Sequence, residues 1–380
     1  MKDHLIKWNE DRMRSEAKSA SGGKNKRILI AMSGGVDSSV AAYLLKQQGY
    51  DVIGITMHLW SGDDRDNVCC SLSSVEDARK VANKIRIPHY TLNMERIFEE
   101  KVVRNFIEEY KVGRTPNPCV RCNQYIKFDA LLSKAEKLGA EYVSTGHYAR
   151  VEKWNGRYLL LKGLDSKKDQ SYFLYPMKQK ALSRTLFPMG NITKAETRKI
   201  AGDLGLPVAE KQESQEICFV PDENYGKFLK NYISDKVRPG SILDKEGNVI
   251  GEHDGIIFYT IGQRKGLGIG GDGPYYVISI DKAKNAIVVG GEQDIFSSEL
   301  IAEKVNFVSI EKLSEPMEVR AKIRYNAAEE DAVLEPYGRG IIRLRFSKPV
   351  RAVTPGQSVV FYQGDKMVGG GIIMSPNDSI

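Results

Sequence analysis

"AMSGGVDSSV", residues 31 to 40, is the stretch that decides the fold. It lies between a short apolar run, "RILIAM" (27 to 32), which predicts a strand, and a segment that predicts a helix (38 to 48). In parallel α/β sheets this strand-to-helix turn is where ligands bind. Gly34 and Gly35 let successive backbone N–H groups point into one concavity, where the positive end of the helix dipole favours phosphate. We therefore expect a phosphate-binding loop here.

The acid in this loop, Asp37, implies a cation, because a carboxylate beside a phosphate needs a positive charge between them, and Mg²⁺ suits both. The loop is not a Walker A loop, since the lysine of GxxxxGK[ST] is absent. It resembles the SGGxDS loop of the PP-loop ATP pyrophosphatase superfamily, which cleaves ATP between its α and β phosphates to adenylate a substrate. The resemblance implies that ATP contacts the loop and two later positions that border the adenosine: Ala31, Met32, Ser33, Gly34, Gly35, Val36, Asp37, Ser38, Met57 and Gly146.

The rest of the chain divides by its pattern. From Lys26 to about Leu161 apolar strands alternate with amphipathic helices, which predicts an α/β fold with a parallel sheet and helices on both faces, and a hairpin turns at Asn155-Gly156. Thr193 and Glu196 frame a capping box that opens a later helix. After about Pro221 glycines and β-rich runs predict two small antiparallel β domains, the last β-barrel-like. The expected domains are a polar, disordered extension (1–25), a PP-loop (adenine nucleotide alpha hydrolase-like) catalytic domain (26–220), a central β domain (221–298) and a C-terminal barrel (299–380).

Composition places the chain among multi-domain globular proteins: 380 residues, 28% charged and 41% hydrophobic. No apolar run approaches the roughly 20 residues of a membrane span, and the first 25 residues lack the apolar core of a secretory signal, so we expect a cytoplasmic protein without membrane contact. The net charge of +7 and pI near 8.9 favour a polyanionic partner. Five cysteines, an odd number, indicate a reducing compartment.

Two of these cysteines, Cys119 and Cys122, form a CxxC in "GRTPNPCVRCN" (113 to 123), which we expect to be a loop before a helix from about Asn123. A CxxC leaves open half a zinc site, a redox dithiol, part of an iron–sulfur site or a sulfur-handling nucleophile. Zinc needs four ligands, and the remaining cysteines, Cys69-Cys70 and Cys218, supply no second CxxC. This disfavours a structural zinc.

Seven motifs in order, from the CxxC to the C-terminus, resemble those of the tRNA-specific 2-thiouridylase family: "GRTPNPCVRCN", "GHYAR", "KKDQSYFL", "SQEICFVP", "YTIGQRKGLGIG", "RYNAAE" and "TPGQSVVFY". The resemblance implies an enzyme that replaces the C2 oxygen of the wobble uridine in tRNA with sulfur. It implies ATP and Mg²⁺, a persulfide supplied by a cysteine desulfurase or a sulfur carrier protein, and a monomer.

The resemblance also implies roles for single residues. Cys122 matches the nucleophile and Cys218 the cysteine that carries the persulfide, and a Cys122–Cys218 disulfide would remain after sulfur transfer. The segment facing the target base is Asn117, Pro118 and Cys119. Contacts with the anticodon stem-loop of tRNA are implied for His147, Lys168, Asp169, Gln170, Arg324, Tyr325 and Gln357.

The chain departs from the family at Cys119, where the commonest form has Asp. Cysteine is a poorer general acid or base than Asp and a better metal ligand. The same thiolation could therefore run through a [4Fe-4S] cluster held by Cys119, Cys122 and Cys218, with an open iron that binds sulfide. The phosphate loop alone would also suit another PP-loop adenylating enzyme, such as GMP synthetase or tRNA lysidine synthetase, or a non-catalytic RNA-binding or iron–sulfur sensor protein.

Overall fold

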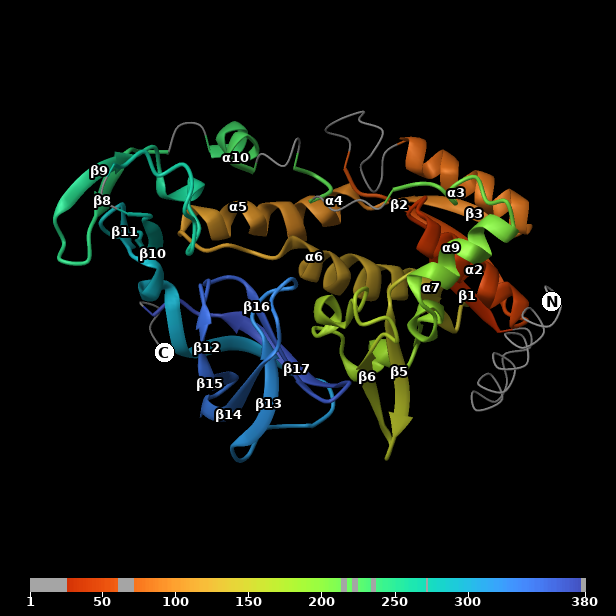
Figure 1. The fold of residues 1–380 in the computed structure, drawn as a ribbon. Coiled ribbons are helices and arrows are strands. Elements are labelled where there is room, and N and C mark those ends of the chain that lie inside the picture. Colours follow the sequence, from red (N-terminus) through yellow and green to blue (C-terminus); the bar gives the residue numbers. More distant parts are fainter. Residues whose placement is uncertain are drawn as a thin grey trace. The chain divides into compact units, whose positions relative to one another are not determined.

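The computed structural model describes residues 26–60, 72–212, 217–220, 225–233, 237–270 and 273–376 (Figure 1). The extension expected to be disordered (1–25) and Cys69-Cys70 lie outside these residues. The chain divides into two compact units, each with its own core. The first unit runs to Phe98 and adds Asn123–Ser171 and Gln179–Cys218, and the second comprises Glu99–Cys122, Tyr172–Lys178 and Phe219–Ile380.

A five-stranded parallel sheet is the centre of the first unit, as predicted. Its strand order is β3-β2-β1-β4-β7, so the chain leaves β1 toward one edge and later returns to its other side. This change of direction makes the carboxyl end of β1 the expected ligand site. The strands are β1 (Arg27–Ala31), β2 (Asp51–His58), β3 (His89–Asn93), β4 (Tyr142–Ser144) and β7 (Thr185–Leu186).

Helices cover both faces of this sheet. Ile28 and Ile30 of β1 pack into a cluster with four helices, while Leu29, which points to the opposite face, is equally inaccessible to solvent. The helices are α2 (Val36–Gln47), α3 (Leu72–Ile85), α4 (Glu95–Phe98), the π-helical η2 (Cys122–Ala130), α7 (Leu131–Lys137), α8 (Gln179–Leu182), η4 (Pro188–Asn191) and α9 (Lys194–Asp203). The predicted capping box of Thr193 and Glu196 opens α9.

The predicted hairpin also belongs to the first unit. Strands β5 (Ala149–Trp154) and β6 (Arg157–Lys162) pair in an antiparallel manner. Asn155 and Gly156 both have positive φ, +48° and +80°, as a two-residue turn of type I′ requires. No helix in the described residues of either unit is long and apolar enough to cross a membrane.

The second unit begins with helical segments that pack through aromatic rings. Phe106 meets Phe219 with ring centroids 5.2 Å apart, and Tyr110 stacks on Tyr225 at the same centroid distance, 5.2 Å. The helical segments are η1 (Glu99–Val103), α5 (Arg104–Lys111), α6 (Pro118–Arg121), η3 (Ser171–Leu174), α10 (Tyr225–Ile233), η6 (Ile256–Phe258) and η7 (Glu292–Ile295).

Two β structures complete the second unit and confirm the predicted fold class, but the first is not purely antiparallel as predicted, because β8 and β11 pair in parallel. A four-stranded sheet has the order β10-β11-β8-β9, formed by β8 (Gly240–Leu243), β9 (Val249–His253), β10 (Tyr276–Asp281) and β11 (Ala286–Gly290). Six further strands follow the order β12-β15-β14-β13-β16-β17, and β12 pairs with β17, which closes a barrel. They are β12 (Phe296–Phe307), β13 (Met317–Lys322), β14 (Glu330–Gly338), β15 (Ile341–Arg351), β16 (Ser358–Gln363) and β17 (Lys366–Ile373).

Candidate active site

The turn between β1 and α2 has the geometry of a phosphate loop. Gly34 has a φ of +70°, which glycine adopts without strain, and Gly35 is the N-cap of α2. The hydroxyls of Ser38 and Ser39 donate to the Gly35 carbonyl oxygen, at 3.2 and 2.8 Å. The Ser33 N–H donates to Ser38 Oγ at 3.2 Å. Two hydroxyls therefore brace the loop from within, and the N–H groups of the first turn of α2 remain at its open end.

Two close backbone approaches fix the loop in place. A Cβ atom on Gly34 would lie 2.3 Å from the carbonyl oxygen of Ser74, and one on Gly146 would lie 2.7 Å from the backbone nitrogen of Ser38. Neither position has room for a side chain. Met57 is buried near the carboxyl end of β2, the neighbour of β1 in the sheet. The structure thus brings the predicted ATP positions together at the carboxyl ends of the sheet strands.

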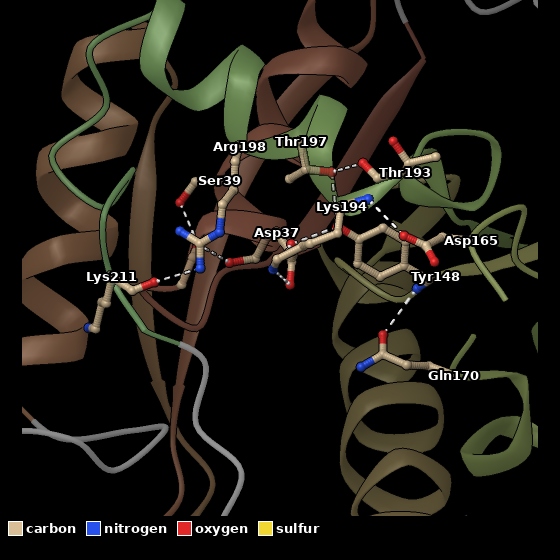
Figure 2. A network of polar contacts seen from close by, with 12 residues as sticks. Asp37, Ser39, Tyr148, Asp165, Gln170, Thr193, Lys194, Thr197, Arg198 and Lys211 are labelled. Atoms are coloured by element: carbon tan, nitrogen blue, oxygen red, sulfur yellow. Dashed lines mark hydrogen bonds and ion pairs between the residues drawn. The ribbon is translucent and has the colours of Figure 1, made fainter. Parts of the chain in front are cut away.

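The carboxylate of Asp37 is the centre of a polar network that sequence reasoning missed (Figure 2). Lys194 Nζ lies 2.7 Å from Asp37 Oδ1 and 2.9 Å from Oδ2, and the Tyr148 hydroxyl donates to Oδ1 at 2.8 Å. Thr197 Oγ1 contacts the Tyr148 hydroxyl at 2.9 Å, and Asp165 accepts from the Lys194 N–H at 3.0 Å. The charge expected beside Asp37 is therefore present in the chain itself, as a lysine.

Two sequence signals bear on this network. Lys194 is the first residue of α9, directly after the predicted N-cap Thr193, and its side chain is only 11% exposed. The cap predicts where the helix begins but not that its first side chain turns to a carboxylate 157 residues earlier. Tyr148 lies in the "GHYAR" motif, which had suggested only its neighbour, His147.

The CxxC is helical and not a loop, which corrects our expectation. Helix α6 begins at Pro118, five residues before the predicted start, because Asn117 is an N-cap whose Oδ1 accepts from the Val120 N–H at 3.2 Å. Proline is well suited to the first helical position. Cys119 is exposed and Cys122, three residues on, is half-buried. Residues three apart share one helical face, so the two thiols lie on the same side of the helix.

Cys218, the predicted persulfide carrier, is half-buried and is the last residue of the first unit, whereas Cys119 and Cys122 belong to the second. Across the described parts of the chain, no three His, Cys, Asp or Glu side chains are gathered as metal ligands. The hypothesis of a [4Fe-4S] cluster therefore gains no support from the structure.

Comparison with known proteins decides the family. Family models match three consecutive ranges: a tRNA methyl transferase HUP domain (26–222), a tRNA methyl transferase PRC-barrel domain (226–291) and an aminomethyltransferase β-barrel domain (297–373). The tRNA-specific 2-thiouridylase MnmA 1 of Caldanaerobacter subterraneus subsp. tengcongensis is 56% identical over 92% of this chain and 98% of its own length. The tRNA-specific 2-thiouridylase MnmA of Clostridium acetobutylicum is 56% identical over 92% and 99%.

The chain belongs to the tRNA-specific 2-thiouridylase family. The domain descriptions mention methyl transfer, but the whole-length relatives carry the assignment, since they match over all three ranges. This confirms the resemblance in the motifs. A solved structure, the U34-tRNA thiolase NcsA of Methanococcus maripaludis with its [4Fe-4S] cluster, matches at 18% identity with a TM-score of 0.38, covering 62% of this chain and 73% of that one. A likeness this weak carries no argument about the site.

Three of the positions that this family resemblance suggested for tRNA contact have structural roles in the first unit. Asp169 accepts from the N–H groups of Gly163 and Ser171, at 3.0 and 3.1 Å, and Gln170 Oε1 accepts from the Tyr148 N–H at 3.1 Å. His147 is only 9% exposed. Lys168 is half-buried. Gln170 thus ties this segment of a 2-thiouridylase to the tyrosine that contacts Asp37.

His147 is enclosed. Its Nδ1 lies 2.7 Å from Thr145 Oγ1, and the rings of Phe128 and Phe187 lie within 6.2 Å of the imidazole. Burial lowers the pKa of His147 well below its ordinary value, and the charge of Lys127 acts in the same direction. The imidazole is therefore neutral near pH 7, and it is a core residue beside Gly146.

The predicted tRNA positions of the second unit lie in the barrel, and two of the three bind main-chain groups. Arg324 Nη2 donates to the carbonyl oxygens of Arg351 and Ala352, at 2.6 and 3.2 Å. Burial and the nearby charge of Arg351 lower the pKa of Arg324. Tyr325 packs on Phe173, with ring centroids 4.4 Å apart. Gln357 donates to the carbonyl oxygen of Thr115, just before the cysteine helix.

Proposed function

We propose that this chain is a tRNA-uridine 2-sulfurtransferase, which uses ATP to replace the C2 oxygen of the wobble uridine with sulfur. Membership of the tRNA-specific 2-thiouridylase family at 56% identity over 92% of the chain carries this proposal. The phosphate loop and the two cysteines that the reaction needs are all present. The domains divide at about residues 220 and 298.

The first half of the reaction is adenylation of the uridine C2 oxygen. ATP lies on the loop from Ala31 to Ser38, with Met57 and Gly146 beside the adenosine. The close backbone approaches at Gly34 and Gly146 support this, because they hold the loop at the amino end of α2, where N–H groups and the helix dipole favour phosphate. Mg²⁺, when bound, neutralises phosphate charge, and Asp37 is the carboxylate of the loop that suits it. Lys194 supplies a second positive charge beside the same carboxylate.

The second half is sulfur transfer. Cys218 carries the persulfide, and its terminal sulfur attacks C2 of the adenylated base while AMP leaves with the bonding electron pair. The Cys122 thiolate then attacks the Cys218 sulfur, which releases the base as 2-thiouridine and leaves a Cys122–Cys218 disulfide. In the other order, Cys122 first releases hydrosulfide from Cys218, and hydrosulfide attacks C2. Either order ends in the same disulfide, which a thiol reductant must reduce before the next turnover.

Substrate binding uses both units of the chain. Asn117, Pro118 and Cys119 face the flipped uridine, which must leave its stack to react. The net charge of +7 favours the anticodon stem-loop of tRNA. Its further contacts are Lys168, Asp169, Gln170, Arg324, Tyr325 and Gln357. His147 does not touch the RNA itself and acts from within the core by shaping the loop at Gly146. A cysteine desulfurase or sulfur carrier protein is the sulfur donor, and the enzyme works as a monomer in the cytoplasm.

Mass spectrometry of tRNA nucleosides tests this function. Wild-type protein with tRNA, ATP, Mg²⁺, a desulfurase and cysteine is expected to form 2-thiouridine, and Cys122→Ser and Cys218→Ser are each expected to lose about 10³-fold or more of that rate. Release of pyrophosphate that depends on tRNA should persist in both variants, because adenylation displaces pyrophosphate from ATP and does not use the thiols. This retained release is the internal control for folding and ATP binding.

Two results would contradict the proposal. Full thiolation by the Cys122→Ser variant would show that Cys122 is not the nucleophile. Absence of any AMP release that depends on tRNA would rule out adenylation and favour a binding protein. Iron analysis of the same preparations separates the persulfide route from the cluster route. An iron-free protein that retains activity supports the persulfide, and activity proportional to bound iron overturns it.

A further inference from the structure

A turn of the barrel binds the segment that leads into the cysteine helix. The Thr115 N–H donates to the Pro355 carbonyl oxygen at 2.8 Å. In return, Gln357 Nε2 donates to the carbonyl oxygens of Thr115 and Pro116, at 2.9 and 3.3 Å. Both partners belong to the second unit. One glutamine amide therefore holds two consecutive carbonyl groups directly before the N-cap, Asn117.

The contact is close, and side chains of the same segment extend it. Gly356 has a φ of +88°, and a Cβ there would lie 3.0 Å from both the nitrogen and the carbonyl oxygen of Thr115. Thr115 Oγ1 lies 3.1 Å from Thr260 Oγ1, and Arg114 Nη2 lies 3.1 Å from Glu303 Oε1. The segment 114–116 is thus pinned to the β structures at several points.

On another side the same segment borders open space. Gly113 and Arg114 line a cavity of about 950 Å³, together with Pro355 and parts of β10 and β12. Because this cavity removes packing from one side, polar contacts carry much of the positioning. Loss of the Gln357 amide would leave two carbonyl groups without this partner and free the segment to move.

We infer that Gln357 is a positioning residue for Cys122, and that it links tRNA binding in the barrel to the cysteine helix. Its amide N–H groups hold the segment before Asn117, and the cap at Asn117 sets where α6 begins and hence where Cys119 and Cys122 stand. Among the described residues, nothing donates to Gln357 Oε1, so this oxygen is open to a 2′-hydroxyl or a base N–H of RNA. The tRNA half of this inference rests on the proposed function; the positioning half does not.

The chain offers a matched control. Gln363 lies on the same barrel, and its Nε2 likewise donates to a backbone carbonyl oxygen, that of Glu318 at 3.1 Å, but it is exposed and far along β16 from the turn. Gln357→Glu is a second variant, which keeps an acceptor oxygen and the length of the side chain but removes both N–H donors. In protein without tRNA, the added charge cannot act through repulsion of RNA.

The test measures Cys122 in protein without tRNA. A short pulse of iodoacetamide, quantified peptide by peptide, is expected to label Cys122 about fivefold faster in Gln357→Ala and Gln357→Glu than in wild type, since a hydrogen bond of ordinary strength is lost. Gln363→Ala should match wild type, and Cys218, in the other unit, should keep its wild-type rate in all variants. With tRNA, Gln357→Ala should lower kcat about tenfold for lost positioning, beyond any rise in KM for a lost tRNA contact.

Two outcomes overturn the inference: Cys122 labelling unchanged in both Gln357 variants, or labelling of Cys122 and Cys218 raised together, which would mean general unfolding. If the wild type forms no 2-thiouridine, the proposed function fails. The labelling experiment still tests whether Gln357 positions Cys122, because it uses no tRNA.

Discussion

In the proposed function the phosphate loop and the cysteine helix carry the two halves of one reaction, yet they are held in different ways. The backbone turn of the loop is braced within ten residues of sequence, by the hydroxyls of Ser38 and Ser39 and the conformation of Gly34, although distant segments also pack against it. The cysteine helix has one local brace, its cap at Asn117, and otherwise depends on partners as distant as Gln357, 242 residues after Thr115. A site built locally can be recognised from sequence, whereas one held from a distance takes its position from the fold.

The comparison predicts that the two sites fail separately. Lys194→Met should give the largest effect, a fall of about 10²–10³-fold in tRNA-dependent AMP release, because a positive charge beside the phosphates is lost and Asp37 loses its partner. Labelling of Cys122 without tRNA should stay at the wild-type rate. Both quantities can be measured on one preparation.

Lys199→Met is the matched control for this change. Lys199 lies on the same helix, but its side chain is 65% exposed and pairs with Asp203, so the variant should release AMP at the wild-type rate. Lys194→Arg, which keeps the charge with a different shape, should fall between the two. If Lys194→Met released AMP normally, the network around Asp37 would have only a structural role.

A second, smaller effect is expected in stability. Gly34→Ala should lower the free energy of unfolding of the first unit by about 2–4 kcal/mol, since a φ of +70° is strained for alanine and its Cβ would lie 2.3 Å from the Ser74 carbonyl oxygen. Gly139→Ala is the control, because Gly139 has nearly the same φ, +68°, with nothing within 4 Å of an added Cβ. It should lose only the conformational part, about 1 kcal/mol.

Thermal unfolding measured with and without ATP checks both variants. Gly34→Ala should lower the melting temperature more than Gly139→Ala and should also lose the stabilisation that ATP gives, because its clash lies in the binding loop. Equal melting temperatures in the two variants would show that Ser74 moves away without loss, and that the loop is less tightly fixed than the geometry indicates.

Sequence alone predicted the elements whose signals are local. The parallel strands, the Asn155-Gly156 turn, the cap at Thr193 and the glycine turn between β1 and α2 all depend on neighbouring residues, and the structure confirms them. The predicted start of α6 is wrong although its signal is local. Asn117 is a good N-cap and Pro118 a good first helical residue, but we expect a loop at this segment from the sequence.

The partners of the site residues could not be predicted, because they come from distant segments. Nothing near Asp37 indicates Lys194 or Tyr148, which lie 157 and 111 residues later. The motif containing His147 suggested a surface contact, but Phe128 and Phe187 enclose its ring. Contacts of this kind exist only once the chain has folded, so a motif identifies the residue and not its surroundings.

The smallest expected effect is a loss of stability at low pH. It concerns the phosphate loop and not the cysteine helix, since His147 directly follows Gly146, which packs on that loop. Burial lowers the pKa of His147 in the folded protein, so below about pH 6.5 the unfolded chain binds a proton that the folded chain does not. The free energy of unfolding of the first unit should therefore decrease as the pH decreases below this value. This group contributes up to about 1.4 kcal/mol per pH unit. Above pH 7 the imidazole is neutral in both states and contributes no slope.

His147→Gln isolates this contribution, because glutamine keeps a polar group near Thr145 and does not titrate. The pKa values of His89 and His253 are also lowered by burial, but both residues remain in the variant, so their effects cancel in the difference. Melting temperatures at pH 7 and pH 5 should show a smaller fall for the variant than for wild type. Equal falls would mean that His147 takes up its proton in the folded state, which requires that the aromatic enclosure beside Gly146 opens to water.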